Sequence, residues 1–145
     1  MTRRSATSQG YRSRAVRLYL VRHAHAASGE PDELRPLSAQ GREQARELGE
    51  RLRAEGASPD VVLTSPLLRA RETGAELARA LNAETEPDER LQPGASLEDV
   101  RAAVEGRGQQ VVIVGHQPDC SQIAAALTGS EPAFPPAGLA VLELD

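Results

Sequence analysis

The sequence contains no lysine and no tryptophan, and only 2% of its 145 residues are aromatic. A core with so few rings must be built from Ala, Val and Leu, which suit buried strands and stacked helices in a layered α/β domain. Cys120 is the single cysteine, so no disulfide bond can form within the chain. A chain of this length can bury a single core without disulfides or metal ions.

Long apolar runs are also missing. No stretch approaches the roughly 20 apolar residues that a membrane-spanning helix needs, and the N-terminus lacks the apolar segment of a secretory signal. We therefore expect a cytoplasmic protein without membrane contacts. Residues 1–14 are rich in Ser and Arg and free of acids, which predicts a flexible basic tail, with an organellar transit peptide as the alternative. Residues 15–145 are expected to form the domain.

Acidic residues are absent from the start of the chain and abundant in the rest. Residues 1–29 contain six Arg and no acid, whereas residues 30–145 contain 11 Arg and 21 acidic residues. Nucleic-acid binding needs a broad basic face, which this acidic body does not provide. We expect no nucleic-acid partner.

Short apolar runs alternate with helical patterns along the chain. Four runs are predicted to be strands, at 16–21, 61–64, 111–114 and 139–144. Helices are predicted at 39–55, 97–104 and 121–127. A further helix is predicted to begin with Ser65 as its cap and Pro66 as its first residue. The stretch 82–95 looks irregular. This alternation predicts a three-layer α/β/α sandwich around a mostly parallel sheet.

Basic side chains follow three of the predicted strands, at the edge where α/β proteins bind ligands. Arg22, His23 and His25 follow the first strand, Arg69 lies one turn beyond the second, and His116 follows the third. Each of these residues alone would most simply be structural or solvated. Their joint placement at one edge of one sheet favours a functional site.

These residue types indicate a phosphate site. Two guanidinium groups, of Arg22 and Arg69, can make bidentate hydrogen bonds to a dianion. A neutral imidazole can attack phosphorus, and neighbouring arginines keep it neutral by lowering its pKa, so His23 is the candidate nucleophile. His116 can donate to the non-bridging oxygens. This chemistry requires no metal ion and no other cofactor.

Three segments resemble the motifs of the histidine phosphatase superfamily: Leu20-Val21-Arg22-His23-Ala24, Ser65-Pro66-Leu67-Leu68-Arg69-Ala70-Arg71-Glu72-Thr73 and Val112-Ile113-Val114-Gly115-His116-Gln117-Pro118. The resemblance spans about residues 16–145. The resemblance implies a phosphoglycerate mutase-like fold. It also implies that His23 is phosphorylated, that Arg22 and Arg69 clamp the phosphate, and that His116 is their electrostatic partner.

Within this superfamily, the run Leu34-Arg35-Pro36-Leu37-Ser38 followed by Gly41 is most similar to the SixA-like phosphohistidine phosphatases. The similarity implies hydrolysis of phosphohistidine, or of small phosphomonoesters, through a covalent phosphohistidine on His23. The substrate would be a phosphorylated protein histidine or a small phosphorylated metabolite.

The chain departs from the superfamily pattern at the general acid. Many members have a glutamate where this sequence has Gln92. Asp88 and Glu89 are the candidate donors. A phosphohistidine substrate needs an acid less, because imidazole leaves more easily than an alkoxide.

Two further residues near the first motif are assigned only peripheral roles. His25 stands where the superfamily often has an acidic residue and is expected at the rim of the pocket. Arg35 is expected either to reach the phosphate or to form a surface ion pair with Asp32 or Glu33.

Three other functions fit parts of the pattern. A metal hydrolase would use His23, His25 and His116 as ligands, but it leaves Arg22 and Arg69 unexplained, since cations repel a metal ion. A phosphate- or phosphoprotein-binding module of the same fold would not need a nucleophile at position 23. A mutase would need a second phosphoacceptor site, for which the sequence offers no candidate.

Overall fold

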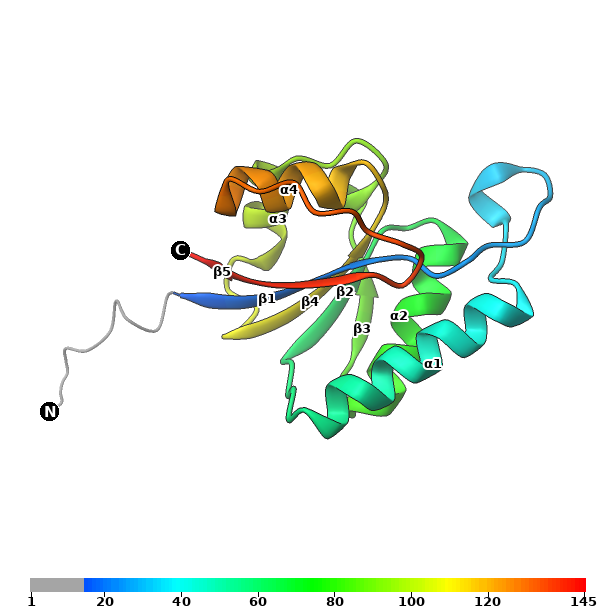
Figure 1. Cartoon of the computed structure of the whole chain (residues 1–145), viewed down its shortest axis with the longest axis horizontal. Helices are drawn as coiled ribbons and strands as arrows, with labels where there is room; N and C mark the ends of the chain where they lie inside the picture. Colours follow the sequence, from blue (N-terminus) through cyan, green and yellow to red (C-terminus); the bar gives the residue numbers. More distant parts are fainter. Residues whose placement is uncertain (1–14) are drawn as a thin grey trace, which may run out of the picture.

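The computed structural model describes residues 15–145, so the predicted basic tail of residues 1–14 lies outside the described residues. Five strands form one sheet in the order β3-β2-β4-β1-β5 (Figure 1). They are β1 (Val16–Arg22), β2 (Val61–Thr64), β3 (Thr85–Pro87), β4 (Gln110–Gly115) and β5 (Leu139–Leu144). The first four are parallel, and β5 runs antiparallel to β1 at the edge. The predicted mostly parallel sheet is confirmed.

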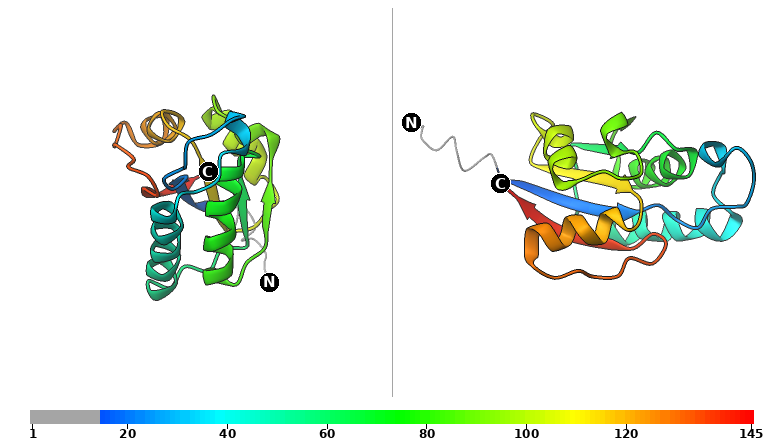
Figure 2. Two further views of the ribbon diagram at one scale, coloured as in Figure 1. Left: turned by 90° about the vertical axis from the view of Figure 1, so that its right-hand side faces the viewer. Right: turned by 90° about the horizontal axis from the view of Figure 1, so that it is seen from above.

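Helices cover both faces of the sheet (Figures 1 and 2). Helices α1 (Ala39–Ala54) and α2 (Leu68–Leu81) pack on one face, and α3 (Leu97–Val104) and α4 (Asp119–Thr128) pack on the other. Because strand side chains alternate between faces, Val111 and Ile113 of β4 join the cluster under α3 and α4, while Val112 and Val114 join the cluster under α1 and α2. Burial on both faces explains why the strands are apolar throughout, and the three-layer prediction is confirmed.

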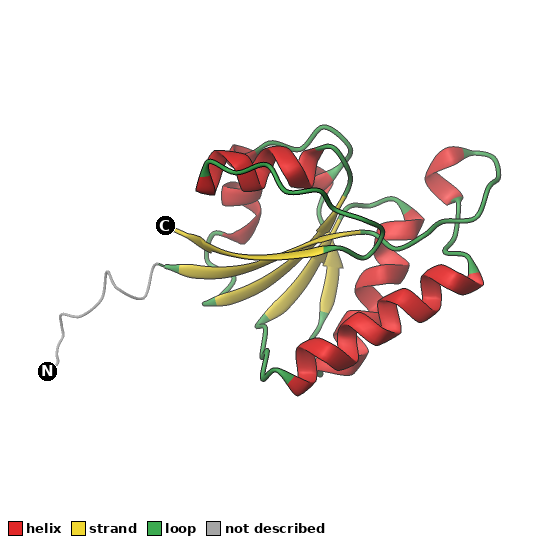
Figure 3. Ribbon diagram, in the orientation of Figure 1, coloured by secondary structure: helices red, strands yellow, loops and turns green. Residues whose placement is uncertain are grey.

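Two short 3-10 turns complete the layout, η2 (Asp32–Leu34) after β1 and η3 (Glu89–Leu91) after β3 (Figure 3). The helices predicted at 39–55 and 97–104 are observed at 39–54 and 97–104, and α4 begins two residues before the predicted start. Among residues 15–145, no helix combines the length and the apolar character that crossing a membrane requires.

Two predictions about local structure were wrong. Helix α2 begins at Leu68, not at Pro66, and its N-cap residue Leu67 makes no side-chain cap bond. The stretch 82–95, predicted to be irregular, contains both β3 and η3. Strand β3 reads Thr85-Glu86-Pro87 and is exposed throughout, so it lacks the apolar run by which the other strands were found.

Candidate active site

A pocket of about 280 Å³ lies at the carboxyl end of β1 and is lined by Arg22, His23, Ala24, His25, Ala26, Arg35, Arg69 and Pro136. Strand pairing places Arg22 opposite Gly115, the residue before His116, because β1 and β4 are parallel neighbours. Arg69 comes from the first turn of α2. The fold therefore gathers His23, both predicted phosphate clamps and His116 at one edge of the sheet.

The imidazole of His23 is oriented by a hydrogen bond to the backbone. Its Nδ1 lies 2.7 Å from the carbonyl oxygen of Ala24. A carbonyl only accepts hydrogen bonds, so Nδ1 must carry the proton, and the lone pair of the neutral ring lies on Nε2. Burial lowers the pKa of His23 to about 4; the bond to Ala24 opposes this effect, and the charges of Arg69, Arg22 and Arg35 add to it. The ring of His23 is thus neutral at pH 7, which is the state that a nucleophilic imidazole requires.

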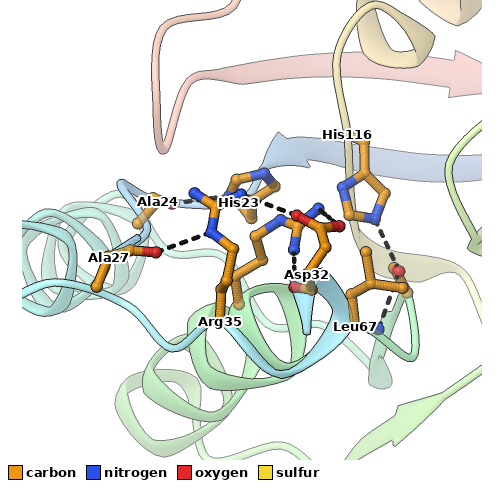
Figure 4. Close-up of polar contacts among 9 residues, drawn as sticks. His23, Ala24, Ala27, Asp32, Arg35, Leu67 and His116 are labelled. Carbon is orange, nitrogen blue, oxygen red and sulfur yellow. Dashed lines mark hydrogen bonds and ion pairs between the residues drawn. The ribbon is translucent and has the colours of Figure 1, made fainter. Parts of the chain in front are cut away.

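His116 is the second imidazole of the site. It is only 4% exposed, and its ring centroid lies 5.3 Å from that of His23, with the ring planes inclined by 64°. Its Nε2 is 2.8 Å from Oγ of Ser65 (Figure 4). Burial, followed by the proximity of His23 and Arg69, lowers the pKa of His116 to about 4. The hydroxyl of Ser65, predicted to cap a helix, accepts a hydrogen bond from the backbone N–H of Leu67 at 3.2 Å and also orients His116.

Arg22 presents an incompletely paired guanidinium group to the pocket. One terminal nitrogen, NH1, donates to the carbonyl of Phe134 at 2.9 Å. Within residues 15–145, its Nε is the one buried side-chain polar atom that has no hydrogen-bond partner. An unpaired buried donor costs free energy, which marks Arg22 as a group that awaits an acceptor.

Arg69 is anchored by the loop that follows β1. Its side chain is almost fully buried, and its two terminal nitrogens donate to the backbone carbonyl of Asp32 at 2.9 Å and to the Asp32 carboxylate at 3.2 Å. Sequence reasoning considered Asp32 only as a surface partner of Arg35. No local pattern distinguishes it from other Asp–Arg pairs, so its contact with Arg69 had no sequence signal.

Arg35 both lines the pocket and forms an ion pair. Its Nε donates to the carbonyl of Ala27 at 2.8 Å, and its NH1 donates to the carboxylate of Asp32 at 3.0 Å. The pairing with Asp32 is the surface alternative expected from the sequence. Because Arg35 is also part of the pocket wall, a third guanidinium group stands beside His23.

The segment after His23 is held against the start of α1. The Nδ1 of His25 lies 2.7 Å from the hydroxyl of Ser38, and its backbone N–H donates to Gln44 at 3.0 Å. A Cβ at Gly41 would lie 2.0 Å from the carbonyl oxygen of His25, so only glycine allows this approach. The sequence predicts that His25 lies at the rim of the pocket, and in the structure His25 is one of the residues that line it.

The two candidate general acids are not brought to the pocket. The carboxylate of Asp88 accepts hydrogen bonds from the backbone N–H, Nε and NH2 of Arg90 at 2.9, 3.0 and 2.8 Å, and Arg90 holds its pKa below the usual range. Glu89 is exposed. Neither residue lines the pocket, so their role as acids stays a prediction.

A metal centre built from the three histidines has no geometric counterpart in the described part of the chain. No group of three His, Cys, Asp or Glu side chains in residues 15–145 is arranged to hold a metal ion. His25 turns its ring toward Ser38, as described above.

Comparisons with known proteins agree with the fold and the motifs. A model of the histidine phosphatase superfamily (branch 1) matches residues 18–93. An uncharacterized protein of Picosynechococcus sp. is 36% identical over 120 residues, which cover 77% of this chain and 73% of that protein. The phosphohistidine phosphatase SixA of Escherichia coli is 28% identical over 141 residues, covering 90% of this chain and 86% of SixA. A solved structure of the protein histidine phosphatase SixA complexed with tungstate superimposes with a TM-score of 0.79, at 27% identity, over 90% of this chain and 89% of that chain.

Proposed function

The chain belongs to the histidine phosphatase superfamily, and we propose that it hydrolyses phosphohistidine, or small phosphomonoesters, through a phosphoryl group carried on His23. The substrate is a phosphorylated protein histidine or a small phosphorylated metabolite. The proposal includes action in the cytoplasm and no requirement for a metal ion or another cofactor.

The observation that carries the proposal is the state of His23. Its Nδ1–H is bound to the Ala24 carbonyl, and its pKa of about 4 leaves Nε2 unprotonated at neutral pH. An unprotonated imidazole nitrogen beside arginines has both the lone pair and the anion-binding surroundings that attack on phosphorus requires. A module that only bound phosphate would gain nothing from this arrangement.

In the first step, Arg22 and Arg69 hold the phosphoryl oxygens while Nε2 of His23 attacks the phosphorus. A bond forms between Nε2 and phosphorus, the bond from phosphorus to the leaving group breaks, and the electron pair goes to the leaving atom. The ring of His116 lies 5.3 Å from that of His23, and it can donate a hydrogen bond to a non-bridging oxygen as charge spreads over the phosphoryl group.

In the second step, water attacks the phosphorus of phospho-His23. A bond forms between the water oxygen and phosphorus, the bond between phosphorus and Nε2 breaks, and its electron pair returns to Nε2. The proton that the water loses passes to an oxygen of the departing inorganic phosphate. The arginines act as positive charges in both steps and change neither position nor protonation, since a guanidinium group stays charged throughout the working pH range.

Phosphohistidine is the favoured substrate because no carboxylic acid lines the phosphate pocket. An alkoxide leaving group needs a proton donor in the transition state, whereas an imidazole that already carries a proton leaves without one. The likeness to SixA, named as a phosphohistidine phosphatase, supports the same choice. The tungstate bound to the SixA structure supports an oxyanion as the ligand of the corresponding pocket.

The test is hydrolysis of phosphoramidate and of p-nitrophenyl phosphate by wild type and by His23→Ala, with a chelator present. We expect turnover by wild type only, a preference for phosphoramidate, and an acid-labile, base-stable phosphoryl label on wild type alone. Glu33→Gln, outside the pocket wall, is the control and should match wild type. Near wild-type turnover by His23→Ala would refute the mechanism, and absence of turnover by wild type would favour the phosphate-binding module.

A further inference from the structure

The carboxylate of Asp32 lines a hollow that adjoins the phosphate pocket. A second hollow, of about 620 Å³, shares His25, Ala26 and Arg35 with the phosphate pocket, and its other wall residues include Asp32 and Glu30. A leaving group larger than the phosphoryl group can extend from the phosphate pocket into this adjoining space. The second hollow provides that space, and its wall carries negative charge.

Asp32 is ionised and has room for another partner. Its two carboxylate oxygens accept hydrogen bonds from Arg35 at 3.0 Å and from Arg69 at 3.2 Å. These arginines keep its pKa below the usual range, so the group cannot serve as a proton donor near neutral pH. Its side chain is nevertheless 63% exposed, and each carboxylate oxygen can accept more than one hydrogen bond.

Leaving groups of phosphoryl transfer differ in charge, so a nearby carboxylate interacts differently with each kind. A phosphorylated imidazole leaves as neutral imidazole only if its other ring nitrogen carries a proton, so the reactive phosphorylated ring is cationic. The nitrogen of phosphoramidate is likewise protonated before it leaves as ammonia. An aryl or alkyl oxygen instead gains negative charge as its bond to phosphorus breaks. A carboxylate attracts the first kind of group and repels the second.

Building on the proposed phosphatase activity, we propose that Asp32 is a specificity-determining residue that favours phosphoryl groups on protonated nitrogen over phosphate esters. In the favoured reaction, Nε2 of His23 forms its bond to phosphorus, and the phosphorus–nitrogen bond breaks with its electron pair going to the leaving nitrogen. The proton of the leaving group stays on that group. Asp32 accepts a hydrogen bond from the protonated group and transfers no proton.

The experiment compares wild type, Asp32→Asn and Glu33→Gln on phosphoramidate and on p-nitrophenyl phosphate, measuring kcat/KM for each pair. Asparagine keeps an acceptor oxygen, and the Asp32 backbone carbonyl that binds Arg69 is unaffected. We expect Asp32→Asn to lower kcat/KM for phosphoramidate and to leave unchanged or raise that for the ester, so that their ratio falls about threefold to fivefold, the scale of one exposed charge contact. Glu33→Gln removes the same charge one residue away, outside both pocket walls, and should keep the wild-type ratio.

Opposite changes for the two substrates are what distinguish a specificity role. If both kcat/KM values fall together, Asp32 only positions Arg69, and if both rise together, Asp32 merely competes with phosphate; either result overturns the inference. Failure of wild type to hydrolyse either compound would refute the proposed function itself, so the two failures are distinguishable.

Discussion

The turns η2 and η3 are built alike but act differently. Each follows a parallel strand and has an aspartate at or beside its first residue. In η3, Asp88 binds Arg90, within its own turn. In η2, Asp32 binds Arg35 nearby and also Arg69, which lies 37 residues further along the chain. The aspartate of η3 is paired within its own turn, and the aspartate of η2 is also paired with an arginine that lines the phosphate pocket.

The position of the preceding strand explains this difference. Strand β1 lies inside the sheet, next to β4, whereas β3 forms the edge. The chain that leaves β1 emerges beside the carboxyl end of β4, and its turn η2 packs against α2, where Arg69 is available. The chain that leaves β3 has a neighbour on one side only. An acidic residue after a strand is thus a better candidate for the site when the strand is internal.

The largest difference in activity between changes at η2 and at η3 is expected when the arginine paired with each turn's aspartate is replaced by alanine. We expect Arg69→Ala to lower kcat/KM by roughly 10²-fold or more, because a charge that stabilises the transition state is lost. Arg90→Ala should stay within about twofold of wild type, since its partner Asp88 does not line the pocket. Steady-state kinetics on one substrate checks both. Equal effects of the two changes would remove the distinction between η2 and η3.

Alanine substitution of a glycine near each turn should give a smaller difference in activity. In Gly41→Ala, the new Cβ would collide with the His25 backbone and shift the segment that leads to η2, so we expect kcat/KM to fall about tenfold. Gly94, just after η3, has a φ of +100°, and the space that a Cβ would occupy there is open. Gly94→Ala should therefore cost about 1 kcal/mol of stability without loss of activity. Thermal unfolding and kinetics together test this, and an active Gly41→Ala would show that the segment tolerates displacement.

Removal of the acids of η3 should have the smallest effect on catalysis. We expect Asp88→Asn and Glu89→Gln to change kcat/KM by less than about twofold, because neither side chain reaches the pocket wall. Asp88→Asn should lower the unfolding free energy by about 0.5–1 kcal/mol, since the ion pair with Arg90 is lost while asparagine can still cap η3. A loss of 10²-fold in either variant, measured on an ester substrate, would restore the sequence-based assignment of a general acid here.

The core of the fold could be predicted because its signals are local. Runs such as Val111-Val112-Ile113-Val114 are apolar on both faces, and Arg22, His23 and His116 follow such runs directly. The errors arose where a local signal was weak or had another cause. Strand β3 is held by pairing with β2 and carries no apolar run. Ser65 before proline has the local pattern of a helix cap, but its hydroxyl binds a histidine 51 residues away.

The hydrogen-bond partners of His23 and His116 differ in whether they can donate as well as accept. The Ala24 carbonyl accepts only, so His23 is confined to one tautomer. The Ser65 hydroxyl can rotate, donating to Nε2 of His116 when that nitrogen is bare and accepting from it when it is protonated. His116 can therefore gain or lose a proton without breaking its hydrogen bond. The hydrogen bond between His116 and Ser65 thus survives a change of protonation, whereas the one between His23 and Ala24 requires a single tautomer of the neutral ring.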